Sequence, residues 1–279
     1  MGMRWFPSFR FSSFGLLACV GAFFIVSIAH AAPLTADPVA GALELLARKQ
    51  CAAKPVIVFE NGSRETFDTW RKVITSIDTD ASIFAYNRPG YGKSEATGQP
   101  RDGQTIVEEL RATLRRQGMQ APYVLVGHSL GGLYMQLFAR AYPHEVRGLV
   151  LVDSLYPGVV KKTEDFPFYT RVAKRMFLSK TVNQEIDEID RTSSQVLALP
   201  WTKDIPVERL INAPKGPSAI PIDFGAFNSG KQLKDTINAL YPNATISVVD
   251  SDHRMQVSTP DAVVSAIRRV MPSANAPGC

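Results

Sequence analysis

Tyr-Val-Leu-Val-Gly-His-Ser-Leu-Gly-Gly, at residues 123–132, joins two patterns in an informative order. The first half is an apolar run rich in β-branched residues, as in a buried strand, whereas residues 130–142 have the pattern of a helix that Pro143 ends. The glycines permit a sharp turn between the two elements, and such a turn holds Ser129 in a strained conformation with its hydroxyl exposed. The stretch therefore predicts a strand, a tight turn that carries a serine, and a helix.

The segments on either side repeat this alternation. Short β-rich runs bounded by Gly, Pro, Asn or Asp alternate with longer helix-like segments, which is typical of a mostly parallel sheet flanked by helices. The predicted fold class is therefore α/β. We expect six strands, at residues 56–60, 83–87, 123–127, 148–152, 219–223 and 246–249, and helices at residues 105–117, 130–142 and 261–271.

Two regions depart from the alternation. Residues 37–50 have the pattern of a helix. Residues 157–217 contain Pro-rich and aromatic pieces around two short helices, and an insertion of this length on a parallel sheet is typical of a cap. We therefore predict one domain at residues 32–279, with a helical cap insertion at about 157–217.

The composition favours a folded domain and limits the kind of partner. The chain of 279 residues is 45% hydrophobic and 20% charged, which excludes a disordered protein. The formal net charge is only +5, and the Lys and Arg residues are scattered without interleaved aromatic residues. A nucleic-acid partner is therefore not expected.

Residues 1–31 have the layout of a signal peptide. Two arginines precede an apolar run at residues 14–28, which ends in Ala29-His30-Ala31, a small-x-small cleavage site. This predicts an exported protein, periplasmic or secreted, without a stable membrane span after cleavage. The alternative is an uncleaved membrane anchor formed by residues 14–30, because the run is close to the shortest spanning length.

Two cysteines remain after cleavage, Cys51 and Cys279. An oxidising compartment would let them pair and join the two ends of the domain, and the alternative is two unrelated thiols. The sequence has no CxxC motif and no Cys/His cluster, so no metal site is expected.

A serine hydroxyl is a weak nucleophile at neutral pH, so chemistry at Ser129 requires a base within hydrogen-bond reach. Of the four histidines, His30 lies in the leader, His128 adjoins the serine with its side chain directed elsewhere, and His144 follows a proline in a surface turn. His253 remains, in a polar loop between the last strand and the last helix, and is the predicted base. The alternative is a surface histidine without a catalytic role.

A developing oxyanion needs hydrogen-bond donors, and two backbone amides are candidates. The N–H of Leu130 begins the helix, where a free donor and the helix dipole both favour negative charge. The N–H of Ser63 lies in the loop after the first predicted strand, where Gly62 lets the backbone turn toward the site. A simple Asn-Gly turn is the alternative interpretation of this loop.

Together these segments resemble the α/β-hydrolase superfamily, specifically its esterase-like branch. The resemblance covers roughly residues 55–271 and rests on several motifs in the right order, at residues 56–63 with Trp70 after them, 86–94, 126–132, 148–154 and 251–260. It implies an α/β-hydrolase fold. A serine at the turn argues against dehalogenase or epoxide hydrolase chemistry, because relatives with those activities use an aspartate there. The chain departs from the family in having Asn61-Gly62 where His-Gly is usual. It also departs in the predicted helix at residues 37–50, where many relatives carry two leading strands, which implies a smaller sheet.

The acid of a Ser-His-acid triad has two candidates. Asp153 ends the strand after the helix that follows Ser129, and in some family members a carboxylate at this position reaches the histidine. Asp223 ends the next predicted strand, but the family's more common acid position, a few residues later, holds Phe-Asn-Ser at residues 227–229. We therefore predict Asp153, with Asp223 as the alternative.

These residues predict a serine hydrolase that cleaves a carboxylic ester, or a related acyl group, in a small-molecule substrate. The reaction would pass through an acyl-enzyme and need no metal or organic cofactor. Amide, thioester and lactone substrates stay open. A non-catalytic binding protein on the same scaffold, and a cofactor-free peroxidase or acyl transferase, are the alternative functions.

Overall fold

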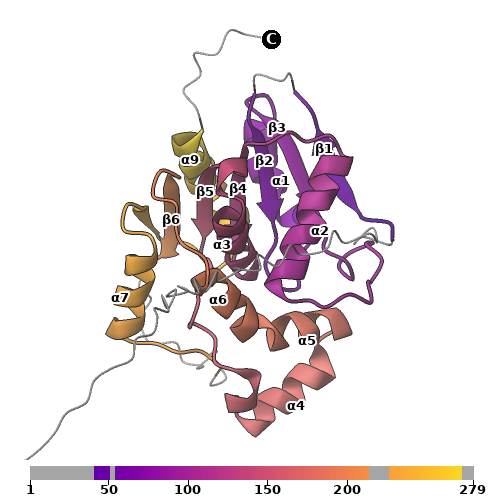
Figure 1. Cartoon of the computed structure of the whole chain (residues 1–279), viewed down its shortest axis with the longest axis vertical. Helices are drawn as coiled ribbons and strands as arrows, with labels where there is room; N and C mark the ends of the chain where they lie inside the picture. Colours follow the sequence, from indigo (N-terminus) through magenta and orange to yellow (C-terminus); the bar gives the residue numbers. More distant parts are fainter. Residues whose placement is uncertain (1–40, 51–53, 214–225, 272–279) are drawn as a thin grey trace, which may run out of the picture. The chain divides into compact units, whose positions relative to one another are not determined.

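The computed structural model describes residues 41–50, 54–213 and 226–271 (Figure 1). In these residues seven strands form one sheet. The order along the sheet is β1-β3-β2-β4-β5-β6-β7. Neighbouring strands are parallel except β1 and β3, which are antiparallel. The predicted α/β class with a mostly parallel sheet is confirmed. The strands are β1 (Leu45–Arg48), β2 (Val56–Glu60), β3 (Ser82–Tyr86), β4 (Tyr123–His128), β5 (Val146–Val152), β6 (Val207–Asn212) and β7 (Thr245–Val249).

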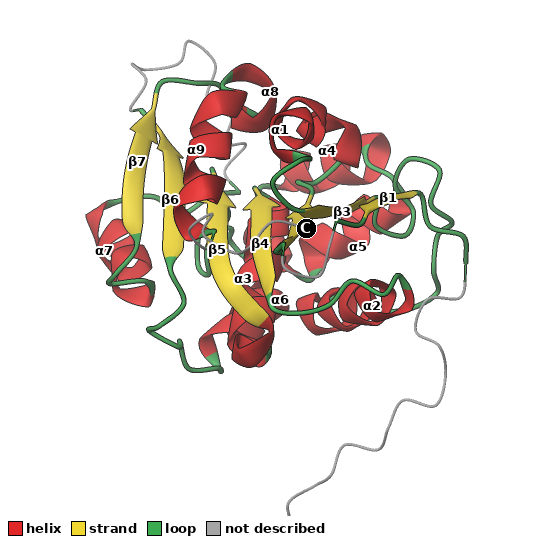
Figure 2. Cartoon of the chain, turned by 90° about the horizontal axis from the view of Figure 1, so that it is seen from above, coloured by secondary structure: helices red, strands yellow, loops and turns green. Residues whose placement is uncertain are grey.

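Helices cover both faces of this sheet (Figure 2). Strands β2, β3 and β4 are buried along their whole length, as their continuous apolar sequences predict for parallel strands between two layers. Three of the helices were predicted to within two residues at each end, namely α2, α3 and α9. One face is covered by α1 (Arg71–Ile77), α8 (Met255–Ser258) and α9 (Pro260–Val270), and the other by α2 (Gly103–Arg116), α3 (Leu130–Ala141) and α6 (Ile189–Leu197).

The chain between β5 and β6 forms a cap, in which three α-helices occur where two were predicted. Its last helix, α6, is fastened to the start of α2, because Thr192 Oγ1 accepts the Gly103 N–H at 2.8 Å. Gln195 also donates to Asp102 at 2.7 Å. The remaining helices are α4 (Phe168–Phe177) and α5 (Lys180–Asp187) in the cap, α7 (Lys231–Leu240) before β7, and the 3-10 turns Phe67–Trp70, Pro143–Glu145 and Thr163–Asp165.

The predicted helix at residues 37–50 is wrong over the part that the structure describes. Leu45–Arg48 forms strand β1, with Leu45 opposite Tyr86 and Arg48 opposite Ile83 of β3. The sequence Leu-Leu-Ala-Arg favours a helix by propensity. The outer edge of β3, however, offers backbone donors and acceptors that need partners, and pairing with them outweighs the propensity.

The strand after β5 also lies in a different place from the prediction. It is β6, Val207–Asn212, inside the residues assigned to the cap insertion, so the insertion is shorter than predicted. The charged pair Glu208-Arg209 interrupts the apolar pattern there, and this hid the strand. Glu208 is nevertheless buried, because it pairs with Arg269 at 2.7 Å. The strand predicted at residues 219–223 lies outside the described residues.

The predicted signal peptide at residues 1–31 and both cysteines, Cys51 and Cys279, also lie outside the described residues. Within the described ranges, no helix combines the length and the apolar character that crossing a membrane requires.

Candidate active site

Ser129 lies in the turn between β4 and α3, in a backbone conformation that side chains rarely adopt. Its φ is 51° and its ψ is −122°, and α3 begins at the next residue, Leu130. The turn lies directly against the loop after β2, since a Cβ on Gly131 would collide with the carbonyl oxygens of Glu60 and Asn61. Glycine at position 131 therefore lets the serine turn approach that loop.

Three residues from three separate loops meet at one edge of the sheet. Oγ of Ser129 lies 3.1 Å from Nε2 of His253, and Nδ1 of His253 lies 2.7 Å from Oδ2 of Asp153. Ser129 follows β4, Asp153 follows β5, and His253 lies between β7 and α8. Because the carboxyl ends of parallel strands share an edge, the fold brings together the residues that the sequence predicts as nucleophile, base and acid.

These contacts indicate which ring nitrogen of His253 carries the proton. An ionised carboxylate only accepts, so Nδ1–H donates to Asp153 and Nε2 is left with its lone pair toward Ser129. The hydroxyl of Ser129 can then donate to Nε2. This is the arrangement that a general base and a hydroxyl nucleophile require.

The electrostatic surroundings strengthen His253 as a base. Its pKa is raised above the ordinary value of 6.5, chiefly by the hydrogen bond to Asp153. Partial burial opposes this shift of the pKa, while the charges of Asp153, Glu65 and Asp252 add to it. The ring therefore holds a proton more firmly than a free histidine does.

Asn212, at the end of β6, joins Asp153 to the loop that carries His253. Its Nδ2 donates to Oδ2 of Asp153 at 2.7 Å and, more weakly, to the carbonyl oxygen of Asp252 at 3.3 Å. Sequence reasoning missed this residue. The alternative acid, Asp223, lies outside the described residues.

His128, the residue before the serine, forms a second histidine–carboxylate pair. Its side chain is 1% exposed, and its Nδ1 lies 2.8 Å from Oε2 of Glu65. Its Nε2 lies 2.7 Å from the carbonyl oxygen of His253, and because a carbonyl only accepts, this Nε2 must carry a hydrogen. His128 therefore holds the backbone of His253 in place. Burial would raise the pKa of Glu65, but the contact with His128 lowers it overall.

The residues of the two predicted oxyanion amides line the same cavity as the serine. Leu130 is the first residue of α3, where amides have no partner within the helix. Ser63, Leu130, Ser129 and His253 all line the cavity. In the loop before Ser63, Asn61 is buried, accepts from Trp70 Nε1 at 2.9 Å and donates to a backbone carbonyl of β3 at 2.7 Å.

The cavity has a volume of about 500 Å³ and mostly apolar walls. Among the aromatic residues of the predicted cap, the buried Phe166 and the exposed Phe177 line it, whereas Phe168 and Tyr169 are exposed and do not line it. Other apolar walls are Leu155, Val160, Leu178, Ile186 and Ile189. Within the described part of the chain, no group of three His, Cys, Asp or Glu side chains is arranged to hold a metal ion.

A model of the alpha/beta hydrolase fold family matches residues 55–219, more than half of the chain. The chain therefore belongs to the alpha/beta hydrolase family. Among solved structures, a thermophilic esterase from Thermogutta terrifontis superposes with a TM-score of 0.60 at 17% identity, over 82% of this chain and 92% of that one. The two proteins share the fold.

Two curated proteins share part of the sequence. The uncharacterized protein YqjL of Bacillus subtilis is 36% identical over 97 residues, which are 35% of this chain and 38% of that protein. A bifunctional esterase/perhydrolase of Acinetobacter calcoaceticus is 27% identical over 114 residues, which are 40% of this chain and 41% of that protein. The chain thus matches less than half of the length of each of these relatives.

Proposed function

We propose that this protein is a serine hydrolase that cleaves carboxylic esters through an acyl-enzyme on Ser129. The observation that carries the proposal is the unbroken hydrogen-bond chain from Ser129 through His253 to Asp153, of which Ser129 and His253 line an apolar cavity. Membership of the alpha/beta hydrolase family supports it.

In the first half of the reaction, Oγ of Ser129 attacks the carbonyl carbon while Nε2 of His253 takes the hydroxyl proton. The negative charge that forms on the carbonyl oxygen is bound by the N–H groups of Leu130 and Ser63. Asp153 orients His253 and stabilises its charged form. His253 then gives its proton to the departing alcohol oxygen, which leaves the acyl group on the serine.

In the second half, water attacks the acyl carbon and loses a proton to His253. The bond from Ser129 Oγ to the acyl carbon breaks, the serine regains its proton, and the carboxylic acid leaves. The apolar walls of the cavity, such as Phe166 and Ile189, suit a substrate with an apolar acyl or alcohol group of moderate size. No metal or organic cofactor takes part in this scheme.

A related reaction deserves a parallel assay, because one relative is named an esterase/perhydrolase. The same acyl-enzyme can transfer its acyl group to hydrogen peroxide instead of water, which yields a peracid and free Ser129. Product analysis with peroxide or an alcohol as competing acceptor separates hydrolysis from acyl transfer.

Export is a separate proposal that rests on residues 1–31 alone. We propose that this segment directs the protein out of the cytoplasm, with retention as an anchor through residues 14–30 as the alternative. N-terminal sequencing of the protein from its own cells separates cleavage before Ala32 from retention.

The test of the hydrolase is hydrolysis of p-nitrophenyl acetate and butyrate by wild type, Ser129→Ala and Ser194→Ala. Ser194 is exposed on α6, so its variant controls for loss of a serine elsewhere. We expect turnover and fluorophosphonate labelling in wild type and Ser194→Ala, and neither in Ser129→Ala. If folded wild type neither turns over nor is labelled, a non-catalytic binding role replaces the proposal.

A further inference from the structure

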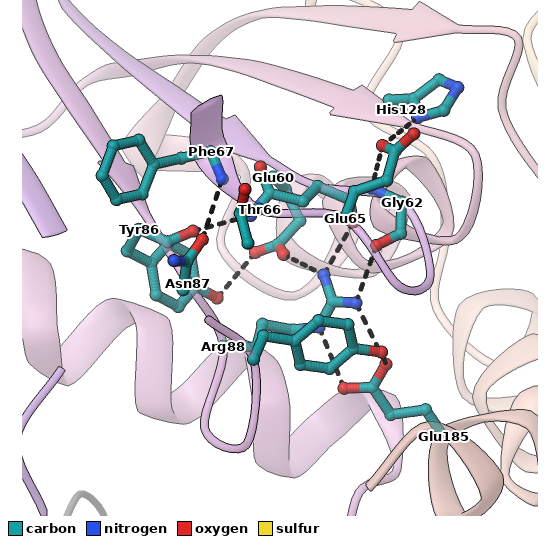
Figure 3. A network of polar contacts seen from close by, with 12 residues as sticks. Glu60, Gly62, Glu65, Thr66, Phe67, Tyr86, Asn87, Arg88, His128 and Glu185 are labelled. Carbon is teal, nitrogen blue, oxygen red and sulfur yellow. Dashed lines mark hydrogen bonds and ion pairs between the residues drawn. The ribbon is translucent and has the colours of Figure 1, made fainter. Parts of the chain in front are cut away.

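Arg88, just after β3, is a fully enclosed cation close to the oxyanion loop, residues 61–63 after β2 (Figure 3). Its side chain is 1% exposed. A guanidinium has five N–H donors, and the structure gives all five an acceptor. Those acceptors are one carboxylate oxygen of Glu60, both carboxylate oxygens of Glu185, and the carbonyl oxygens of Asn61 and Gly62.

The two carbonyl contacts determine the direction in which the peptide groups of the oxyanion loop point. Arg88 Nη1 donates to the Asn61 oxygen at 2.7 Å, and Nη2 donates to the Gly62 oxygen at 3.1 Å. In a planar trans peptide the C=O and the following N–H point in opposite directions. The Gly62 carbonyl points at Arg88, so the Ser63 N–H points away from it, and Ser63 lines the cavity with Ser129.

The preceding peptide follows the same rule. The Asn61 carbonyl points at Arg88, and the Gly62 N–H on the other side lies 3.3 Å from Oε2 of Glu65. The loop is therefore held from both sides, by a cation on its carbonyls and by a carboxylate on one of its amides. A Cβ on Gly62 would come within 2.9 Å of that Glu65 oxygen, so glycine is needed for this approach.

The cap, together with Glu60 of β2, fixes the direction of Arg88 itself. Glu185, on α5, is 0% exposed and receives two parallel hydrogen bonds, from Nε at 2.9 Å and from Nη2 at 3.0 Å. Tyr91 adds a third, from its hydroxyl at 2.6 Å. Burial raises the pKa of Tyr91 to about 12, and the charge of Glu185 adds to this, so the hydroxyl stays a donor.

Such a buried ion pair needs a reason other than stability. Apolar side chains of similar volume stabilise a fold about as well as a buried pair does, because the desolvation of both charges offsets their attraction. An apolar side chain could not, however, bind two successive carbonyl oxygens. Lysine could not do so with the same geometry, because its three donors do not form a planar fork.

We infer that Arg88 is a positioning residue that aims the Ser63 amide into the oxyanion hole, and that Glu185 of the cap holds Arg88 in the orientation this requires. The oxyanion hole is then complete only when α5 is seated against the domain. The inference rests on the proposed hydrolase function, in which Ser63 N–H binds the oxyanion.

The test compares Arg88→Lys with Arg140→Lys. Arg140 is a matched control, because it is also buried and donates to backbone carbonyls, those of Leu199 and Leu240. The probes are an alkyl trifluoromethyl ketone, which forms a tetrahedral oxyanion with the active serine, and the carbinol made by reducing it, which does not. Inhibition constants are measured against p-nitrophenyl butyrate hydrolysis, or by fluorine NMR where turnover is slow.

We expect Arg88→Lys to weaken binding of the ketone about 10- to 100-fold, which is somewhat less than the loss of a whole oxyanion donor would cause. Its affinity for the carbinol should change by less than about 3-fold. Arg140→Lys should change both by less than about 3-fold at a similar melting temperature. An unchanged ratio of ketone to carbinol affinity in folded Arg88→Lys overturns the inference.

Glu185→Gln is a second, milder variant that is tested by itself should Arg88→Lys not fold. We expect it to weaken ketone binding about 10-fold, and an unchanged ratio of ketone to carbinol affinity in folded Glu185→Gln would count against the inference. Where Arg88→Lys does fold, Glu185→Gln should add less than about 2-fold in that background, because both act through one contact. Full additivity of the two substitutions would refute the role of Glu185. Failure of the hydrolase proposal is seen separately, as a wild type that neither turns over nor reacts with fluorophosphonate.

Discussion

The two histidines of the site share one kind of partner and differ in the other. Nδ1 of His128 lies 2.8 Å from Glu65, and Nδ1 of His253 lies 2.7 Å from Asp153. Nε2 of His253 faces the hydroxyl of Ser129, whereas Nε2 of His128 faces a backbone carbonyl. A hydroxyl can release a proton and a carbonyl can only accept a hydrogen bond, so only His253 is placed to act as a base.

Solvent exposure also distinguishes the two histidine rings, and again it favours His253 as the base. The side chain of His128 is 1% exposed and that of His253 is 58% exposed, although the ring centroids are only 4.6 Å apart. A base has to meet substrate and water and change its charge in each cycle, while a buried ring with both nitrogens bonded is suited to hold its neighbours still. A histidine–carboxylate pair is thus no sign of a base until the group at Nε2 is known.

The largest effect should come from replacing each histidine by glutamine. We expect His253→Gln to lower kcat for p-nitrophenyl butyrate by about 10⁴-fold or more, because the serine loses its base. His128→Gln retains an amide N–H for the carbonyl of residue 253, so we expect a loss of about 10-fold. Steady-state kinetics measures both, with circular dichroism to verify folding. Equal losses in the two variants would remove the distinction drawn here.

Replacing the two carboxylates should also have unequal effects on kcat, with the larger loss at Asp153, the partner of His253, and the smaller at Glu65, the partner of His128. We expect Asp153→Asn to lower kcat by about 10³- to 10⁴-fold, because an amide N–H facing Nδ1 favours the wrong ring tautomer. Glu65→Gln still offers a hydrogen bond to His128 and should cost about 10-fold. The same assay measures both variants. A Glu65→Gln enzyme as impaired as Asp153→Asn would show that the buried pair takes part in proton transfer.

The serine turn and its base could be predicted from sequence because their signals are local. Gly-x-Ser-x-Gly requires a strand before it and a helix after it, and both are visible within residues 123–142. His253 followed from the elimination of three other histidines. Asp153 followed from the family resemblance, because it ends a strand where some members carry the acid and the more common acid position holds no carboxylate here. The structure brings it to 2.7 Å from the His253 ring.

The supporting residues could not be predicted, because their roles depend on contacts between distant segments. Glu65 and His128 are 63 positions apart, and Arg88 and Glu185 are 97 positions apart, so neither pair leaves a pattern in the sequence. Asn212 was hidden with β6, whose buried charges mimic a loop. Strand β1 was missed because its partner edge, not its own propensity, determines its structure.

The pH dependence of the reaction sharpens the contrast between the histidines. His253 is a base only when neutral, so kcat/KM should fall as the pH drops through its pKa, which is raised above 6.5 by the hydrogen bond to Asp153. We therefore expect the midpoint of the acid limb above 6.5, in a profile taken between about pH 5 and 9. Because the Glu65 charge contributes to this shift, Glu65→Gln should move the midpoint down slightly.

The contribution of His253 to stability should change with pH in the opposite direction to its contribution to activity. A histidine whose pKa is higher in the folded than in the unfolded protein stabilises the fold when protonated, and this contribution is lost as the pH rises through the folded pKa. Loss of activity on the acid side should therefore occur without unfolding caused by His253. Melting temperatures measured across the same pH range check this, and an acid limb that follows unfolding would contradict the assignment.

The smallest effect should come from Asn212→Ala, which leaves the three reacting side chains in place. Asp153 would lose one of its hydrogen-bond donors, at 2.7 Å, and the loop of His253 would lose its tie at the Asp252 carbonyl. We expect kcat/KM to fall about 3- to 10-fold through looser orientation of the acid, with KM little changed. Asn238→Ala is the matched control, because Asn238, on α7, also has a side chain in a hydrogen bond, which it accepts from Arg209 at 3.0 Å. An Asn212→Ala enzyme as active as Asn238→Ala would mean that the end of β5 alone fixes Asp153, and that the hydrogen bond from Asn212 of β6 does not orient it.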